Sequence, residues 1–337
     1  MKGFIKQNLI LVVSVLFLGI GCKWTDKNKN VSEDILNKPP FANITDSIKR
    51  FPDDAALYFK RAEILSQNNL HEIANADYKK SWELKEDAQT GRRYASNLSI
   101  IGKQAEAIRL LLNCIDKFPD EQEFKRLLGE VYVQSGRIKQ AISLYDSILK
   151  KDSSNFEAWY EKGKLLEQAK DTMGAIASFQ KAISIQPIDT YALELAHLYA
   201  EIKNKDALVI CDNILDLDSA HELIDPFFIK GIYYSNTQQY ELAGIQFDSC
   251  IRRDWKFTEA YIEKGIALFK QKNYDAALNT FRMAATVTNT DPDAYYWIGR
   301  CYEAVKKMSE AAEYYQRATE LDKNFPEAKE ALKRVEK

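Results

Sequence analysis

Glycine and proline are scarce in this sequence, with 13 and 8 respectively among 337 residues. These residues mark the turns of folds built from many short strands, so their scarcity argues against a β-rich protein. The abundant residues are instead alanine, leucine, glutamate, lysine, tyrosine and isoleucine, which suit long helices. We therefore expect an all-α protein.

The sequence also lacks an excess of charge of one sign. It has 47 Lys and Arg residues and 49 Asp and Glu residues, which gives a formal net charge of −2. No long single-sign block provides the electrostatic footprint of a protein that binds nucleic acid. We expect no nucleic-acid partner. The length of 337 residues exceeds that of most single domains, which leaves either two or three compact domains or one elongated array.

Sequence patterns for catalysis or metal binding are missing as well. The five cysteines form neither CxxC pairs nor a dense, even framework, and no HExxH, GxSxG, P-loop or GxGxxG pattern occurs. We expect no catalytic residue, no metal site and no cofactor. We interpret the histidines as surface or groove residues and the later cysteines as packing residues, with a disulfide or a reactive thiol as the alternative. These residues are His71, His197, His221, Cys114, Cys211, Cys250 and Cys301.

The segment from Met1 to Cys22 has the features of an export signal. Lys2 and Lys6 precede an apolar run from Leu9 to Ile20, which is typical of a secretory signal and too short for a comfortable membrane span. The run ends in Leu-Gly-Ile-Gly-Cys at positions 18–22, which resembles the bacterial lipobox, although Gly19 stands where that motif usually has leucine. The resemblance implies a signal peptide over residues 1–21 and lipidation of Cys22; an uncleaved anchor or an ordinary signal peptide is the alternative.

The next segment, residues 22–40, reads as a tether. It is rich in lysine, asparagine and aspartate, lacks helical periodicity and ends in Pro39-Pro40, as expected of a flexible leash. The folded part is expected to begin near Phe41, with an N-terminal capping segment over residues 41–54 that contains a short helix from Ile44 to Phe51.

Similar six-residue sequence motifs recur along the rest of the chain. Ala158–Gly163 reads AWYEKG, Ala260–Gly265 reads AYIEKG and Ala294–Gly299 reads AYYWIG. The interval from Gly265 to Gly299 is the same as that from Gly129 to Gly163. This interval, about 34 residues, is the period of a repeated helix-turn-helix.

The clearest single repeat runs from Phe156 to Asp189. Its signature residues are Trp159, Gly163, Ala175, Phe179, Ala182 and Pro187. Small residues at the eighth and twentieth places let the two helices approach closely, bulky ones fill the space between them, and proline cannot continue the second helix. This pattern resembles the tetratricopeptide repeat.

The same signature places eight repeats in residues 55–325. Their first residues are Ala55, Ala88, Gln122, Phe156, Asp189, Ile224, Thr258 and Pro292. Their twentieth-place small residues are Ala74, Ala107, Ala141, Ala175, Ala207, Ala243, Ala277 and Ala311. The resemblance implies a right-handed superhelical solenoid, closed by a capping helix over residues 326–337. Lys162, Lys230 and Lys264 stand where the family has leucine, and we expect their stems on the core and their ammonium groups in water.

The resemblance also implies where a partner binds, because in this family the first helices line a concave groove and their places 2, 5, 9 and 12 point inward. In the last three repeats these places carry apolar and aromatic side chains where solvated repeats would carry polar ones. We interpret them as a partner-binding stripe, with ordinary packing as the alternative. The predicted site residues are Phe228, Ile232, Ile262, Ile266, Phe269, Tyr296 and Arg300.

Together these features predict a lipid-anchored protein-binding scaffold of the bacterial cell envelope, at the outer membrane and facing the periplasm. Its partners would be peptide segments or helices of envelope proteins. One alternative is a structural scaffold that associates with itself and buries the stripe in a homodimer. Another is an enzyme or small-ligand receptor, which would need clustered polar residues around a closed pocket.

Overall fold

The computed structural model describes residues 33–220 and 222–336, and every regular element within these ranges is helical. The prediction of an all-α protein is thereby confirmed for this part of the chain. The predicted signal peptide, the lipidated Cys22 and the first part of the tether lie outside the described residues. No helix in the described ranges is long and apolar enough to cross a membrane.

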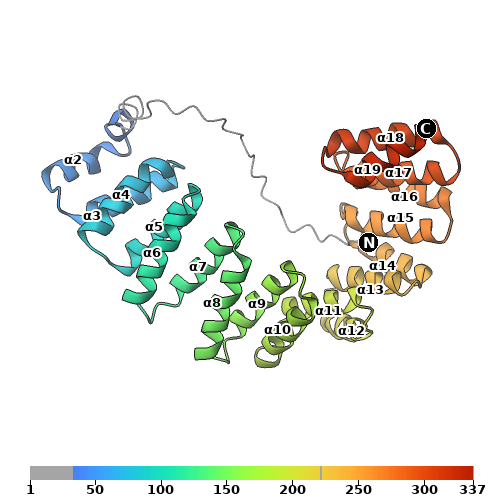
Figure 1. The fold of residues 1–337 in the computed structure, drawn as a ribbon, viewed down its shortest axis with the longest axis horizontal. Coiled ribbons are helices and arrows are strands. Elements are labelled where there is room, and N and C mark those ends of the chain that lie inside the picture. The colour runs from blue at the N-terminus through green and yellow to red at the C-terminus, as the bar shows by residue number, and fades with distance from the viewer. Residues whose placement is uncertain (1–32, 221, 337) are drawn as a thin grey trace. The chain divides into compact units, whose positions relative to one another are not determined.

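Two compact units make up the chain, with the boundary after Gly136. Each helix of unit 1 packs against the next one in the sequence (Figure 1). The helices of unit 1 are α2 (Ala42–Arg50), α3 (Ala55–Gln67), α4 (His71–Leu84), α5 (Ala88–Ile100), α6 (Gln104–Lys117) and α7 (Glu123–Gln134).

Unit 2 holds the remaining twelve helices of the described chain, again with successive helices in contact. They are α8 (Ile138–Lys151), α9 (Phe156–Gln168), α10 (Thr172–Ile185), α11 (Asp189–Glu201), α12 (Asp206–Leu217), α13 (Asp225–Asn236), α14 (Tyr240–Arg253), α15 (Thr258–Lys270), α16 (Tyr274–Val287), α17 (Pro292–Ala304), α18 (Met308–Leu321) and α19 (Pro326–Val335). The boundary between the units falls between α7 and α8, inside the third predicted repeat.

The helix pairs follow the predicted eight repeats closely. Helices α3, α5, α7, α9, α11, α13, α15 and α17 each begin at, or one residue after, a predicted repeat start. All eight twentieth-place alanines are fully buried, with 0% exposed. The turn inside each pair contains one residue with positive φ, and these residues recur at nearly regular intervals: Asn69, Gly102, Gly136, Lys170, Lys203, Gln238, Lys272 and Lys306.

Capping elements occur at both ends of the repeats. The first, α2, occupies Ala42–Arg50, slightly earlier than the predicted Ile44–Phe51. Arg61 of α3 forms a buried bidentate ion pair with Asp77 of α4, at 2.6 and 2.7 Å, and also donates to Thr45 of α2 at 3.1 Å. At the other end, α19 packs against α18 through Ala331 and Leu332.

Close contacts between glycine and an aromatic ring hold the two helices of several repeats together. A Cβ atom added at Gly265 of α15 would lie 2.5 Å from the Phe281 ring of α16, too close for any side chain. The same contact recurs between Gly163 and Phe179, between Gly231 and Phe247, and between Gly299 and Tyr315. The aromatic ring therefore lies directly on the backbone of the first helix, which sets the spacing within each pair.

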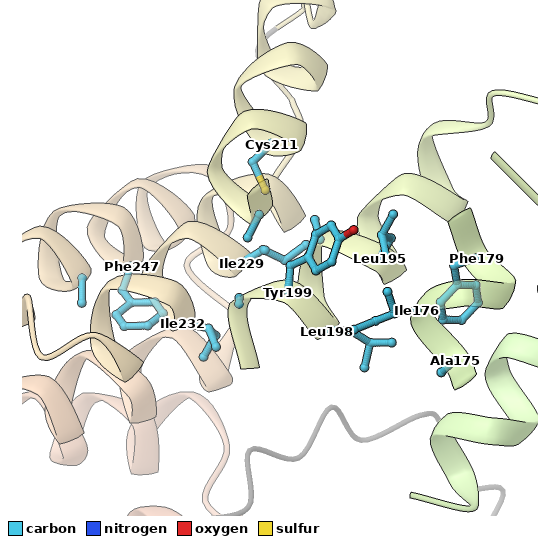
Figure 2. Packing of buried hydrophobic residues seen from close by; sticks show 14 of the residues in the cluster. Ala175, Ile176, Phe179, Leu195, Leu198, Tyr199, Cys211, Ile229, Ile232 and Phe247 are labelled. Carbon is cyan, nitrogen blue, oxygen red and sulfur yellow. The ribbon is translucent and has the colours of Figure 1, made fainter. Parts of the chain in front are cut away.

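One core cluster of unit 2 links several consecutive helices (Figure 2). Leu195, Leu198 and Tyr199 of α11 belong to it, together with Ile229 of α13 and Phe247 of α14. All of these side chains are buried. Apolar contacts between repeats, as well as within them, thus stabilise this unit.

The three seventh-place lysines have partners that the sequence analysis did not name. Lys162 Nζ lies 2.6 Å from Asp146, Lys230 Nζ 2.5 Å from Asp212, and Lys264 Nζ 2.6 Å from Asp248. Each lysine is on a first helix and its aspartate is on the second helix of the preceding repeat. The lysine stems are mostly buried, as expected, but each ammonium group ends on a carboxylate because the adjacent repeat supplies one.

The glycine contact leads to a stability prediction. Gly265→Ala should lower the free energy of unfolding by about 1 to 3 kcal/mol, because the new methyl group forces the Phe281 ring away from α15. Urea denaturation of the full chain measures the change. Gly244→Ala, at a helical position with no atom within 4 Å, is the matched control and should stabilise by up to about 1 kcal/mol. Equal effects of the two substitutions would contradict the proposed role of the contact.

Candidate functional site

Six of the seven predicted stripe residues pack at least in part against the protein itself, Phe269 and Tyr296 among them. Ile232 of α13 is only 7% exposed and belongs to the core. Phe228 packs between the rings of Phe247 and Phe257, with centroids 5.7 and 5.1 Å away. Ile262 and Ile266 of α15 are partly buried against the cluster formed by α15, α16 and α17. Packing accounts for these four side chains, so most of the predicted stripe is not a free surface.

The other three predicted residues come together around one cavity in unit 2. Phe269 of α15 and Tyr296 and Arg300 of α17 line a cavity of about 490 Å³. The remaining lining residues come from the end of α17 and from α19: Glu303, Ala304, Glu327, Glu330 and Arg334. The capping helix therefore forms one wall of the site.

Arg300 is held among aromatic rings in this cavity. Its guanidinium carbon lies 5.5 Å from the centroids of both Phe269 and Trp297 and 5.8 Å from that of Tyr296. Its Nη1 donates a hydrogen bond to Tyr296 Oη at 3.0 Å. No carboxylate among the described residues pairs with Arg300 within 4.0 Å. The guanidinium is thus positioned by the rings while several of its donors remain available for a ligand.

Glu303 and Arg334 were not among the predicted site residues. Arg334 of α19 donates to Glu303 of α17 through Nε at 2.7 Å and Nη2 at 2.8 Å, and Tyr315 Oη donates to the same carboxylate at 2.5 Å. The hydrogen bonds from Arg334 hold the pKa of Glu303 below its usual value. Glu303 could have been found, because it is the twelfth residue of its repeat and faces inward. Nothing in the sequence of α19 indicates that Arg334 reaches it.

The lining of the cavity is mixed in chemical character. Its lining combines two aromatic rings with two guanidinium and three carboxylate groups, and contains no serine, cysteine or histidine. The cysteines within the described ranges, Cys114, Cys211, Cys250 and Cys301, are free and buried. Burial raises the pKa of each of these thiols to about 12, which makes them unreactive. The interpretation of these cysteines as packing residues agrees with their positions.

Four glutamates on first helices of unit 2 share one property. Glu167 of α9, Glu194 and Glu201 of α11, and Glu263 of α15 all have pKa values raised by burial. Neighbouring carboxylates add to the effect, since Glu194 and Glu201 raise the pKa of Glu167, and Glu201 raises that of Glu263. Lys164 acts in the opposite direction on Glu194. These four glutamates are called the acidic cluster below.

The acidic cluster leads to a pH prediction. Burial, followed by the charges of Glu201 and Asp293, raises the pKa of Glu263 from 4.5 to about 7. Below pH 4.5 this carboxyl is protonated in both folded and unfolded chains, so it has no effect on relative stability. As the pH rises to 7 the unfolded chain releases the proton more readily, and the group increasingly favours unfolding.

Glu263→Gln should remove this effect. We expect its gain in unfolding free energy over the parent chain to be smallest below pH 4.5 and to grow until about pH 7, since only the parent must ionise a buried carboxyl. Urea denaturation at a series of pH values measures the difference. Glu241→Gln, at an exposed position of α14, should show no such trend. A difference for Glu263→Gln that does not vary with pH would contradict the assignment.

Comparison with known proteins agrees with this architecture. A tetratricopeptide repeat family model matches residues 101–155, 127–189 and 262–329. A TPR repeat-containing protein of Methanocaldococcus jannaschii is 22% identical over 235 residues, covering 64% of this chain and 41% of the relative. A DnaJ homolog subfamily C member 7 homolog of Schizosaccharomyces pombe is 24% identical over 336 residues, covering 92% of this chain and 66% of the relative. The chain thus spans less than two thirds of either relative.

Two solved structures share the fold. A tetratricopeptide repeat protein from Parabacteroides merdae superposes with a TM-score of 0.63 at 17% identity, covering 74% of this chain and 98% of that one. PilW, described as a widely conserved type IV pilus biogenesis factor, gives a TM-score of 0.54 at 18% identity, covering 63% of this chain and 98% of that one. The family match, the regular repeat period and the helix pairs together support the tetratricopeptide repeat as the structural unit of this chain.

Proposed function

We propose that this chain is a lipid-tethered protein-binding scaffold of the bacterial cell envelope, and that it holds a peptide segment or helix of a partner in the cavity between α15, α17 and α19. The observation that carries the proposal is the convergence of Phe269, Tyr296 and Arg300 on that cavity. These are inward positions of first helices, where tetratricopeptide repeats present side chains to a ligand.

The chemistry of the cavity suits a peptide. Aromatic walls offer apolar contact area, and the guanidinium of Arg300 offers donors for a carboxylate or a backbone carbonyl. Glu327 and Glu330 are exposed residues of α19 at the cavity, so they can contact polar groups of a bound segment. A mixture of apolar walls and a few placed polar groups is typical of ligand sites.

The tether is inferred from the sequence between Met1 and Cys22. A charged start, a short apolar run and a small residue before Cys22 support export and lipidation. The fold-level likeness to PilW, a pilus biogenesis factor, supports an envelope role without selecting a pathway. The outer membrane, with the scaffold facing the periplasm, is the location we propose.

The homodimer alternative is less well supported. It requires a free apolar stripe, but Ile232 is buried and Phe228, Ile262 and Ile266 pack against neighbouring helices. Little apolar surface is therefore left for a second copy at those positions. An enzymatic function would require a nucleophile or a base in the cavity lining, and the lining described above provides three carboxylates and the Tyr296 phenol for that role.

The cavity can be tested by filling it. Ala304 lines the cavity and is exposed at the end of α17, so Ala304→Trp should block a ligand without disturbing the core. In-cell crosslinking and mass spectrometry of the tagged full-length chain should capture an envelope protein. Ala304→Trp and Arg300→Ala should each reduce that capture at least about tenfold, the loss expected for a central contact of about 1.4 kcal/mol or more.

Ala177→Trp is the matched control, because Ala177 is exposed on the second helix α10. Capture should persist in this variant, and circular dichroism should show unchanged helicity in all three. Retention of the same partner by Ala304→Trp and Arg300→Ala would exclude the cavity as the site. If the parent chain captures no protein, the scaffold proposal itself is wrong.

The tether has its own test. Cys22→Ala should move the full-length protein from the membrane fraction to the soluble fraction, because the lipid has no other attachment site at the end of the signal sequence. Metabolic labelling with radioactive palmitate should mark the parent chain and not the variant. Cys114→Ala, at a buried position in α6, is the control and should keep both the label and the membrane association. A labelled Cys22→Ala protein would contradict lipidation at Cys22.

A further inference from the structure

Lysine occupies the tip of the turn inside most repeats of unit 2. The turns inside the fourth to eighth repeats each contain one residue with positive φ, between 62° and 64°: Lys170, Lys203, Gln238, Lys272 and Lys306. Glycine adopts this backbone conformation freely, whereas a residue with a Cβ atom adopts it at a cost. Glycine does occupy the equivalent position in the second and third repeats, at Gly102 and Gly136. The turn itself therefore does not explain the choice of lysine.

These turn tips lie along one edge of unit 2. Helix α10 packs against α11, and the first helices α11, α13, α15 and α17 contact one another in order. Because every repeat has the same helix-turn-helix, equivalent turns of neighbouring repeats lie side by side, about 10 Å apart. The edge that carries Lys170, Lys203, Lys272 and Lys306 is called the lysine edge below. The turns that join one repeat to the next form the opposite edge.

The two edges differ in charge. The turns of the lysine edge also contain Lys205 and Lys307, and their acidic residue, Asp171, accepts a hydrogen bond from the backbone of Gly174. The second helices that follow these turns begin with a few acidic residues: Asp206, Glu241, Asp275 and Glu310. The turns of the opposite edge contain Lys256 and Lys323 against a larger acidic set: Asp152, Asp218, Glu222, Asp254, Asp291 and Asp322. The lysine edge is therefore the basic side of unit 2.

The lysines at the turn tips are exposed, and no ion pair among the described residues involves them. Lysines elsewhere in unit 2 behave differently. Lys162, Lys230 and Lys264 each end on an aspartate at 2.5 to 2.6 Å. The positive charge of the lysine edge is therefore available to a ligand.

Exposed apolar side chains accompany these lysines. Ile202 and Val305 lie in the same turns as Lys203 and Lys306, and Met308 is the first residue of the helix that follows the second turn. All three apolar side chains are 43 to 44% exposed. Lysines interspersed with exposed apolar side chains are typical of surfaces that bind anionic lipid headgroups.

The opposite edge lacks this combination. It also has exposed apolar side chains, notably those of Leu217 and Trp255. Leu217, however, lies between Asp216 and Asp218, and Trp255 follows Asp254. An anionic surface would repel these carboxylates, so charge complementarity selects the lysine edge.

We propose that the lysine edge docks unit 2 on an anionic phospholipid surface, with Lys170, Lys203, Lys272 and Lys306 at the lipid phosphates. This inference rests on the proposed lipid tether and adds the side of the scaffold that faces the membrane. Because the tether already holds the chain near the surface, weak contacts are sufficient to orient it.

The spacing of the lysines suits lipid better than a folded protein. Each lysine is a point charge on a flexible stem, and neighbouring turn tips are about 10 Å apart. Lipid headgroups diffuse laterally and can meet each charge where it stands. A rigid protein surface would need carboxylates at a matching interval.

The test measures how closely each edge of the full-length, lipidated chain approaches a vesicle. A fluorophore is attached through maleimide at Gln238→Cys, an exposed turn tip of the lysine edge, or at Asn289→Cys, exposed in a turn of the opposite edge. The parent chain, treated in the same way, corrects for label at other cysteines. Quenching by a lipid with a nitroxide headgroup is compared in phosphatidylcholine vesicles with and without about one third phosphatidylglycerol.

Quenching at Gln238→Cys should increase in the anionic vesicles. It should decrease again when the salt concentration is raised from about 0.1 M to about 1 M, because the screening length shortens from about 10 Å to about 3 Å. The label at Asn289→Cys should show no such increase. No increase at either position, or equal increases at both, would overturn the proposal.

An edge variant removes the four charges and keeps the fold. It combines Lys170→Gln, Lys203→Gln, Lys272→Gln and Lys306→Gln, and glutamine is compatible with this turn because Gln238 already occupies it at a φ of 64°. With the label at Gln238→Cys, the ratio of docked to undocked chains in anionic vesicles should fall at least about tenfold. Circular dichroism should show unchanged helicity.

A matched control variant removes four exposed lysines away from the lysine edge. It combines Lys150→Gln, Lys151→Gln, Lys181→Gln and Lys323→Gln. The docked-to-undocked ratio should stay within about twofold of the parent. Equal losses in the edge and control variants would show a general effect of net charge and overturn the proposal.

The result is separable from the proposed function. The four lysines do not line the cavity, so the edge variant should capture the same envelope partner as the parent. Loss of that partner with unchanged quenching would show that the edge contacts a protein, which overturns the membrane inference. If the parent does not stay on neutral vesicles, the tether proposal fails. Sedimentation with anionic vesicles at about 0.01 M salt, where screening is weak, then decides: equal sedimentation of parent and edge variant overturns the inference, and a loss in the edge variant alone supports it.

Discussion

The contact between a backbone glycine and an aromatic ring is the constraint on which this architecture depends. In four repeats the ring of the second helix lies on the eighth-place glycine of the first, at a distance that no Cβ atom could occupy. This contact sets how closely the two helices of a repeat approach. It also determines where the remaining faces of the first helix point. The eighth-place glycine therefore helps to position the inward side chains, including those of the cavity.

Between repeats a different interaction recurs. The seventh-place lysines reach aspartates on the preceding second helix at 2.5 to 2.6 Å. Partly exposed pairs of this kind contribute little free energy, typically below about 1 kcal/mol each. Their geometry nevertheless favours one register between neighbouring repeats, because each lysine lies close to a single aspartate. Apolar clusters such as that of α10 to α14 supply most of the stabilisation.

The fold was largely predictable, but the site was only partly so. Repeat starts, buried alanines and turns follow from short-range patterns, since each repeat contains the small and bulky residues that its own pair requires. Whether an inward side chain is free depends on how closely adjacent first helices approach, and the sequence does not encode this locally. Ile232 and His197 were therefore expected at an inward surface and are buried. The cavity was predictable only in part, because Arg334 reaches Glu303 from the capping helix.

Helix α11 shows how the chain tolerates the acidic cluster. Partly buried carboxylates favour unfolding, and the raised pKa values of Glu194 and Glu201 express that cost. Leu195, Leu198 and Tyr199 of the same helix are buried in the core cluster of α10 to α14. Burial of a large apolar side chain stabilises by about 1.5 to 3 kcal/mol, so three such residues on one helix can offset that cost.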